Sequence, residues 1–262
     1  MTWNLAPALV AAAWGAASGA VLPRVIARLP EPEPDPLVPA EDEADFARPV
    51  DDPKEPYADL ARLPGLAWKL AVVSAVLAGL AGARIGWSPA LLFLGYLVPV
   101  GVALALVDWR TRYLPTRLIA PSYVVVGVLV LLGSVLTQDW LSLRSSAIGW
   151  VGCFAVFFVM WFISPGSLAY GDVRLSGLLG LAVGSLGLAQ LVLGMFTGFL
   201  LLAVGGIVLS LARVFHRRHM PFGPFLLAGA FLGAVFPLQL LTAYAWTVEG
   251  VSSLVGSVVD AL

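Results

Sequence analysis

The sequence predicts an all-α, polytopic integral membrane protein, and its composition and the length of its apolar runs are the observations that predict it. Of the 262 residues, 60% are hydrophobic and only 12% are charged, and the mean hydropathy is +0.92. A soluble domain usually carries about 25% charged residues. Apolar runs of about twenty residues, the length of a membrane-spanning helix, recur along the chain. Because the bilayer core offers no water to the backbone, such runs are expected to be helical.

The apolar runs predict about eight transmembrane helices, separated by turns that contain proline, glycine or charged residues. We expect them at about residues 5–22, 65–83, 89–107, 118–136, 146–163, 173–183, 188–213 and 221–246. Pro23 is expected to end the first span, and Pro165 with Gly166 to end the fifth, because proline lacks the amide donor and glycine adds backbone freedom.

Residues 30–64 differ from the rest of the chain. They hold nine of the 19 prolines, and Glu31–Asp59 holds eleven of the 16 acidic residues. Such a segment has too few apolar side chains to form a core. We therefore predict three parts: a first span in residues 1–29, an acidic, largely disordered loop in 30–64, and a seven-span core in 65–262.

The basic residues predict the orientation. In the predicted topology only Arg84 and Arg144, among the 15 basic residues, lie on the side opposite the acidic loop. The positive-inside rule then places the loop in the cytoplasm and both termini outside. The partner that this composition indicates is a lipid bilayer and not a nucleic acid. The one cysteine, Cys153, excludes a disulfide or a multi-cysteine metal site within one chain, and we expect an inert buried thiol.

Two isolated carboxylates are the candidate functional residues. Asp108 is the only acidic residue between residues 60 and 137, and Asp172 is the only one between 140 and 248. An acid at membrane depth is costly and indicates function by default. Each could instead cap a helix at the water boundary. Facing carboxylates share one proton and activate a water without cofactor or metal, and Gly171 leaves space for close approach.

Four stretches resemble motifs of the type IV prepilin peptidases, membrane aspartyl proteases of the GxGD type. Residues 19–30 end in Arg-Leu-Pro, 108–115 place Pro115 seven residues after Asp108, 170–175 read Tyr-Gly-Asp-Val-Arg-Leu, and 221–225 read Pro-Phe-Gly-Pro-Phe. They occur in the family's order and span nearly the whole chain. Two residues depart from its second aspartate motif: Ala169 replaces a glycine and Arg174 replaces a lysine.

The resemblance implies an aspartic endopeptidase of a bacterial inner membrane. Asp108 and Asp172 would be the catalytic pair at the cytoplasmic face, and the residues that bind substrate or support the pair would be Gly171, Tyr170, Arg174 and Pro115. Its substrates would be prepilins or pseudopilins, cut between a basic leader and an apolar helix. Many members carry two Cys-x-x-Cys pairs in the first loop, in a zinc segment associated with N-methylation. This loop is free of cysteine, which argues against zinc and methyltransferase activity, so no cofactor is expected.

Other classes remain open. A proton- or cation-coupled transporter would use Asp108 and Asp172 as relay residues, although transporter sites lie near the midplane and often within internal repeats. An inactive scaffold would not need both aspartates. A preflagellin-processing or signal-peptide-peptidase type protease is a closer alternative. His216 and His219 have metal-like spacing, but the arginines between them favour a basic patch at anionic lipid. The oligomeric state is not indicated.

Overall fold

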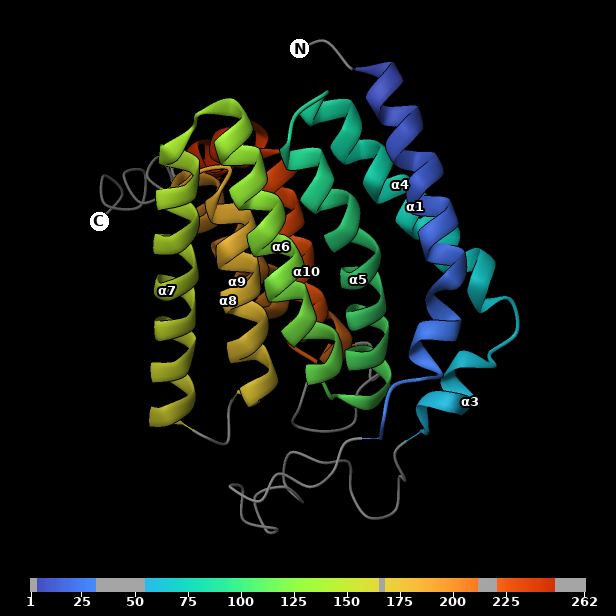
Figure 1. Cartoon of the computed structure of the whole chain (residues 1–262). Coiled ribbons are helices and arrows are strands. Elements are labelled where there is room, and N and C mark those ends of the chain that lie inside the picture. Colours follow the sequence, from blue (N-terminus) through green and yellow to red (C-terminus); the bar gives the residue numbers. More distant parts are fainter. Residues whose placement is uncertain (1–3, 32–54, 165–167, 212–220, 248–262) are drawn as a thin grey trace.

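The protein is a bundle of apolar helices (Figure 1). The structure, a computed structural model, describes residues 4–31, 55–164, 168–211 and 221–247, and the secondary structure assigned there is helical without strands. The helices are α1 (Leu5–Ile26), α3 (Tyr57–Ala61), α4 (Leu66–Ile85), α5 (Ala90–Thr111), α6 (Thr116–Thr137), α7 (Trp140–Ile163), α8 (Tyr170–Gly184), α9 (Leu188–Leu211) and α10 (Gly223–Val235). In this part of the chain, six helices are long and apolar enough to cross a membrane. The predicted fold class, an all-α polytopic membrane protein, is confirmed.

The long helices run alternately up and down the bundle (Figure 1). As a result, the end of α5, the start of α6, the start of α8 and the start of α10 all lie at one end, the lower end in Figure 1. The short helix α3 lies at this same end. Asp108 and Asp172 belong to the α5 and α8 termini gathered here.

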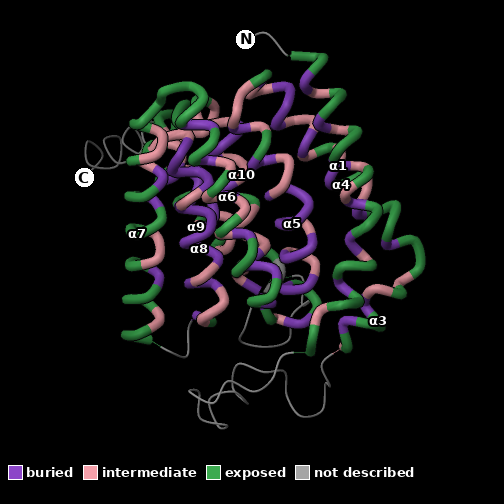
Figure 2. The backbone as a smooth tube through the Cα atoms, viewed as in Figure 1, coloured by how far each residue is buried: buried purple, intermediate pink, exposed green. Residues whose placement is uncertain are grey.

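Burial identifies the centre of the bundle. In the most apolar window of α5, 67% of the residues are buried, against 28% in α1 and 22% in α7. Figure 2 shows the same contrast, with buried positions continuous along α5 and exposed positions along the outer side of α7. The apolar faces of α1 and α7 are therefore available to lipid, whereas α5 and α8 supply most of the buried residues at the centre of the bundle.

Glycines set the closest helix contacts. A Cβ on Gly82 of α4 would lie 2.4 Å from the Pro7 carbonyl oxygen of α1, and one on Gly180 of α8 would lie 2.2 Å from the Gly149 carbonyl oxygen of α7. A Cβ on Gly229 of α10 would lie 2.2 Å from the Gly198 amide nitrogen of α9. Small residues let helix backbones approach closely in lipid. The pairs α1–α4, α7–α8 and α9–α10 are built on such contacts.

Several predicted helix ends differ from the structure, among them the end of α5 at Thr111 against a predicted end near residue 107, and two of the differences have a plain physical reason. The fifth helix begins at Trp140, not near residue 146, because the Asp139 carboxylate accepts the Ser142 N–H at 3.1 Å and caps the helix. The first helix does not end at Pro23 but continues to Ile26. Proline removes only its own amide donor, and its carbonyl still accepts the Ala27 N–H at 2.9 Å.

The sixth helix is longer than predicted and the eighth is shorter. α8 has 15 residues and begins at Tyr170, before the predicted start at residue 173, whereas α10 has only 13 residues. The chain then bends by 104° into a second helix, Pro237–Thr247, so the predicted single span to residue 246 is broken. Pro237 supplies no amide donor and disfavours a helical conformation at Phe236, which explains the break. Counted as one span, the bent pair brings the described total to seven, against the expected eight or so.

The acidic segment is ordered at its C-terminal end, contrary to the prediction for residues 30–64. Residues 32–54 lie outside the described part of the chain, but α3 packs into the protein, with Tyr57 1% and Leu60 0% exposed. Both contact an apolar cluster that includes Ile26 of α1 and Val107 of α5. The polar, proline-rich composition of the segment masks these two apolar side chains, which pack its C-terminal end against α1 and α5.

Candidate active site

Asp108 lies in the last turn of α5 and is 5% exposed. Its Oδ2 accepts the backbone N–H of Gly223, the first residue of α10, at 2.9 Å. A Cβ on Gly223 would lie 2.7 Å from that same oxygen. Only glycine therefore brings its amide to this carboxylate without displacing it.

Asp172 lies in the first turn of α8 and is also 5% exposed. Its carboxylate accepts the backbone N–H of Ala169, the residue that precedes the helix. An acid three positions after the N-cap commonly reaches back in this way. Its Oδ1 is buried and has no hydrogen-bond partner among the described residues. One oxygen thus caps the helix and the other is left for a further contact.

The two carboxylates interact electrostatically across the junction of α5, α8 and α10. Leu114 packs between the glycines beside them: a Cβ on Gly171 would lie 2.9 Å from Leu114 Cβ, and one on Gly223 would lie 3.5 Å from Leu114 Cδ1. Adjacent buried carboxylates are most stable when they share one proton. Chemically, the arrangement suits a water held between a base and an acid.

Tyr170 and Arg174 stand beside the aspartates and contact other groups. The Arg174 guanidinium lies over the Tyr170 ring at 4.5 Å from its centroid and donates a hydrogen bond to Thr116 Oγ1. The Tyr123 hydroxyl donates to the Arg174 carbonyl oxygen at 2.6 Å. The Tyr170 ring also packs on Trp161, 5.1 Å between centroids. These contacts tie the start of α8 to α6 and α7, which is consistent with support of the pair.

Pro115 is buried and directly precedes α6, where its carbonyl accepts the Leu118 N–H at 3.0 Å. It closes the short connection that follows Asp108. Within this connection Arg112 adopts the left-handed conformation, with φ 55°, and its N–H bonds to the Asp108 carbonyl oxygen at 2.8 Å. That turn brings Leu114 back over Gly171 and Gly223.

Four further residues lie at the site, and none of them is among the predicted site residues. Gly223 and Leu114 contact the pair as described, and the Arg112 guanidinium interacts electrostatically with Asp108. The fourth, Tyr57 of α3, lies within electrostatic reach of Asp108. The Pro-Phe-Gly-Pro stretch was a usable signal for Gly223, whereas no local pattern indicates Leu114 or Tyr57.

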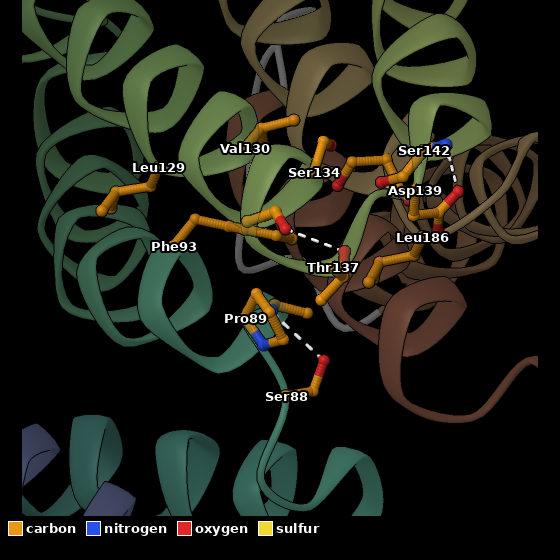
Figure 3. Close-up of a pocket in the computed structure, with 13 residues that line it drawn as sticks. Ser88, Pro89, Phe93, Leu129, Val130, Ser134, Thr137, Asp139, Ser142 and Leu186 are labelled. Atoms are coloured by element: carbon orange, nitrogen blue, oxygen red, sulfur yellow. Dashed lines mark hydrogen bonds between the residues drawn. The ribbon is translucent and has the colours of Figure 1, made fainter.

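A cavity lies at the opposite end of the bundle from the aspartates. It encloses about 480 Å³ between the start of α5, the end of α6, the start of α7 and the turn after α8 (Figure 3). Its single carboxylate, Asp139, is the cap of α7. Among the described residues no group of three histidine, cysteine or acidic side chains could hold a metal ion. His216 and His219 lie outside the described residues.

Comparison with known proteins returned no match: no protein-family model, curated protein or solved structure matches this chain.

Proposed function

We propose that this membrane protein is an aspartic endopeptidase that uses Asp108 and Asp172 to hydrolyse a peptide bond at one face of the bilayer. The observation that supports this best is the pair itself. Two buried carboxylates, each the only acid in a long apolar stretch of sequence, meet at the junction of three helices. A buried acid that merely caps a helix does not require a second one beside it.

The hydrogen bonds suggest a role for each aspartate. The Gly223 N–H stabilises a carboxylate on Asp108, which takes a proton from the bound water as that water attacks the scissile carbonyl carbon. Asp172 carries the shared proton on Oδ1 and donates it to the carbonyl oxygen. The tetrahedral intermediate then collapses: its C–N bond breaks, the amine leaves with the proton that Asp108 took, and the hydroxyl formed from the carbonyl oxygen returns its proton to Asp172. The products are a carboxylic acid and an amine, and the pair again holds one proton.

The resemblance to type IV prepilin peptidases supplies the substrate class: prepilins or pseudopilins, with a basic leader followed by an apolar helix. The end of the bundle that holds the aspartates is the cytoplasmic one in this proposal. Among the described residues, that end carries most of the basic side chains: Arg24, Arg28, Arg62, Lys69, Arg110, Arg112, Arg117 and Arg174, whereas Arg84 and Arg144 lie at the other end. This distribution follows the positive-inside rule.

The test is conservative replacement of each aspartate. Asp108→Asn and Asp172→Asn should each lower cleavage of a co-expressed prepilin by at least about 10³-fold, because removing one member of a catalytic unit costs most of the catalysis. Cleavage is measured by mass spectrometry of the substrate, and insertion by membrane fractionation. Asp139→Asn is the matched control, since it changes the same group at the opposite end and retains a good helix cap.

Normal processing by either catalytic-pair variant would refute the proposal. The transporter alternative gives a different pattern in the same strains. Both Asn variants would then alter proton or cation flux into vesicles, and no cleavage would be seen with the unmodified protein either.

A further inference from the structure

The short helix α3 is held in place by contacts to the helix that carries Asp108. It has only five residues, and an isolated helix of that length is not stable in water. Its Tyr57 and Leu60 are fully buried, against Val107 of α5 and Ile26 of α1 among others. Val107 directly precedes Asp108, so α3 packs beneath the turn that presents the carboxylate.

Tyr57 lies against that turn through its hydroxyl as well as its ring. The buried hydroxyl interacts with the side chain of Thr111 and lies within electrostatic reach of Asp108, Tyr113 and Glu31. Thr111 in turn donates to the Val107 carbonyl oxygen at 2.8 Å, within the last turn of α5. Burial raises the pKa of the Tyr57 phenol above its ordinary value, so the hydroxyl keeps its proton under working conditions.

An ion pair makes the second connection. The Arg110 Nε and Nη2 donate to the two carboxylate oxygens of Glu55 at 2.9 and 3.0 Å, the two-bond geometry that fixes orientation as well as distance. Arg110 is two residues beyond Asp108 in the same helical turn. A further hydrogen bond holds the start of α3, because Glu31 Oε1 accepts the Tyr57 N–H at 2.7 Å.

We propose that α3 is a strap that fixes the last turn of α5 and so positions Asp108, with Tyr57 and the Glu55–Arg110 pair as positioning residues. This inference rests on the proposed peptidase function. The strap acts through Asp108 and touches no substrate. It follows that loosening the strap lowers turnover while leaving substrate affinity unchanged. It also follows that Glu55 and Arg110 act as one unit.

The experiment is a double-mutant cycle on the full-length protein in proteoliposomes. Glu55→Gln, Arg110→Gln and the double variant are compared for kcat and KM on a synthetic prepilin peptide. Each single change should lower kcat by about tenfold with KM within about twofold, because misplacing a catalytic group by about 1 Å can cost about a hundredfold. The double variant should lose no more than either single one.

Tyr57→Phe keeps the buried ring and removes only the hydroxyl, and it should lower kcat in the same way with an unchanged melting temperature. The matched control is Arg62→Gln, at the residue that directly follows α3. It breaks an exposed ion pair to Asp59 of α3, 3.7 Å between nitrogen and oxygen, and should leave kcat unchanged.

Two outcomes would overturn the strap. One is a kcat within twofold of the unmodified protein in both single variants. The other is a double variant in which the two losses multiply. Failure of the peptidase function is distinguishable, because it appears as continued cleavage by Asp108→Asn, whereas failure of the strap leaves Asp108→Asn inactive and Glu55→Gln fully active.

Discussion

At the scale of single residues, each aspartate of the site accepts a backbone N–H from the start of a helix. Asp172 accepts from Ala169 before α8, and Asp108 accepts from Gly223 at the start of α10. Helix N-termini favour negative charge. Helix capping, which the sequence offered as the alternative to chemistry, is therefore present in the structure together with an electrostatic interaction between the two acids. The same contacts that complete the helices hold the carboxylates in place.

Gly223 gives a prediction at this scale. Gly223→Ala places a Cβ 2.7 Å from Asp108 Oδ2, so either the carboxylate or α10 must shift. Under the proposed peptidase function, we expect kcat for cleavage of a prepilin peptide to fall by at least about tenfold, since small displacements of a catalytic group are costly. Kinetics on purified protein would measure it.

The control for Gly223→Ala is Gly152→Ala. A Cβ on Gly152 meets no atom within 4 Å, so this helix glycine accepts a methyl group without displacement. Equal kcat values in the two variants would contradict the assigned contact between Gly223 and Asp108.

The sequence predicted the two acids and some of the residues around them, Gly171, Tyr170, Arg174 and Pro115, but not the contacts made by Gly223, Leu114 and Tyr57. Asp108 and Asp172 stand out because acids are scarce in membrane helices, which is a local property. The Gly223 amide reaches Asp108 across a separation of 115 residues, and the short-range pattern that marks a turn or a cap does not encode such a contact. Tyr57 was missed for a different reason, because its acidic, proline-rich neighbours dominate the composition of the segment.

At the scale of helices, the apolar runs located the spans well and their ends less well. The start of α7 depends on one side-chain cap by Asp139, and the end of α10 depends on Pro237. Hydropathy averaged over a window of residues gives little weight to a single capping side chain or a single proline. α8 is shorter than a full span, and it is nonetheless covered by its neighbours, with Val173, Leu175 and Leu178 fully buried. Its packing partners, and not its own length, keep it inside the bundle.

The contact between α9 and α10 gives a prediction at the scale of helices. A Cβ on Gly229 would meet the Gly198 amide nitrogen at 2.2 Å and the Gly198 Cα at 2.4 Å. Gly229→Ala should therefore push the two helices apart and destabilise the protein by about 1–3 kcal/mol, the usual range for overpacking.

Thermal unfolding of Gly229→Ala in detergent, followed by far-UV circular dichroism, measures this loss. Gly152→Ala again serves as the reference and should shift stability by less than about 0.5 kcal/mol. A melting temperature for Gly229→Ala equal to that of the reference would show that the α9–α10 contact is looser than described.

At the scale of the whole molecule, the two ends of the bundle differ. One end gathers the aspartates, α3 and most basic residues, and the other holds the cavity lined by serine, threonine and Asp139 (Figures 1 and 3). Charge alone predicted which helix ends lie together. It did not predict which helices touch, because apolar helices of similar length look alike in composition and choose partners through a few small residues.

The packing of α1 against α4 bears on how the protein is made. α1 contacts mainly α4, although residues 27–65 separate the two in sequence. The ribosome therefore delivers α1 to the membrane before its partner exists, and their pairing must occur after insertion of both. A covalent link is not needed for such pairing if both helices insert independently. Residues 1–31 and 55–262, expressed as two polypeptides in one cell, should therefore reassemble, which co-purification through a tag on the smaller fragment would detect. A variant of that fragment with Gly15→Leu, whose Cβ would lie 2.4 Å from the Ser74 carbonyl oxygen of α4, should fail to co-purify.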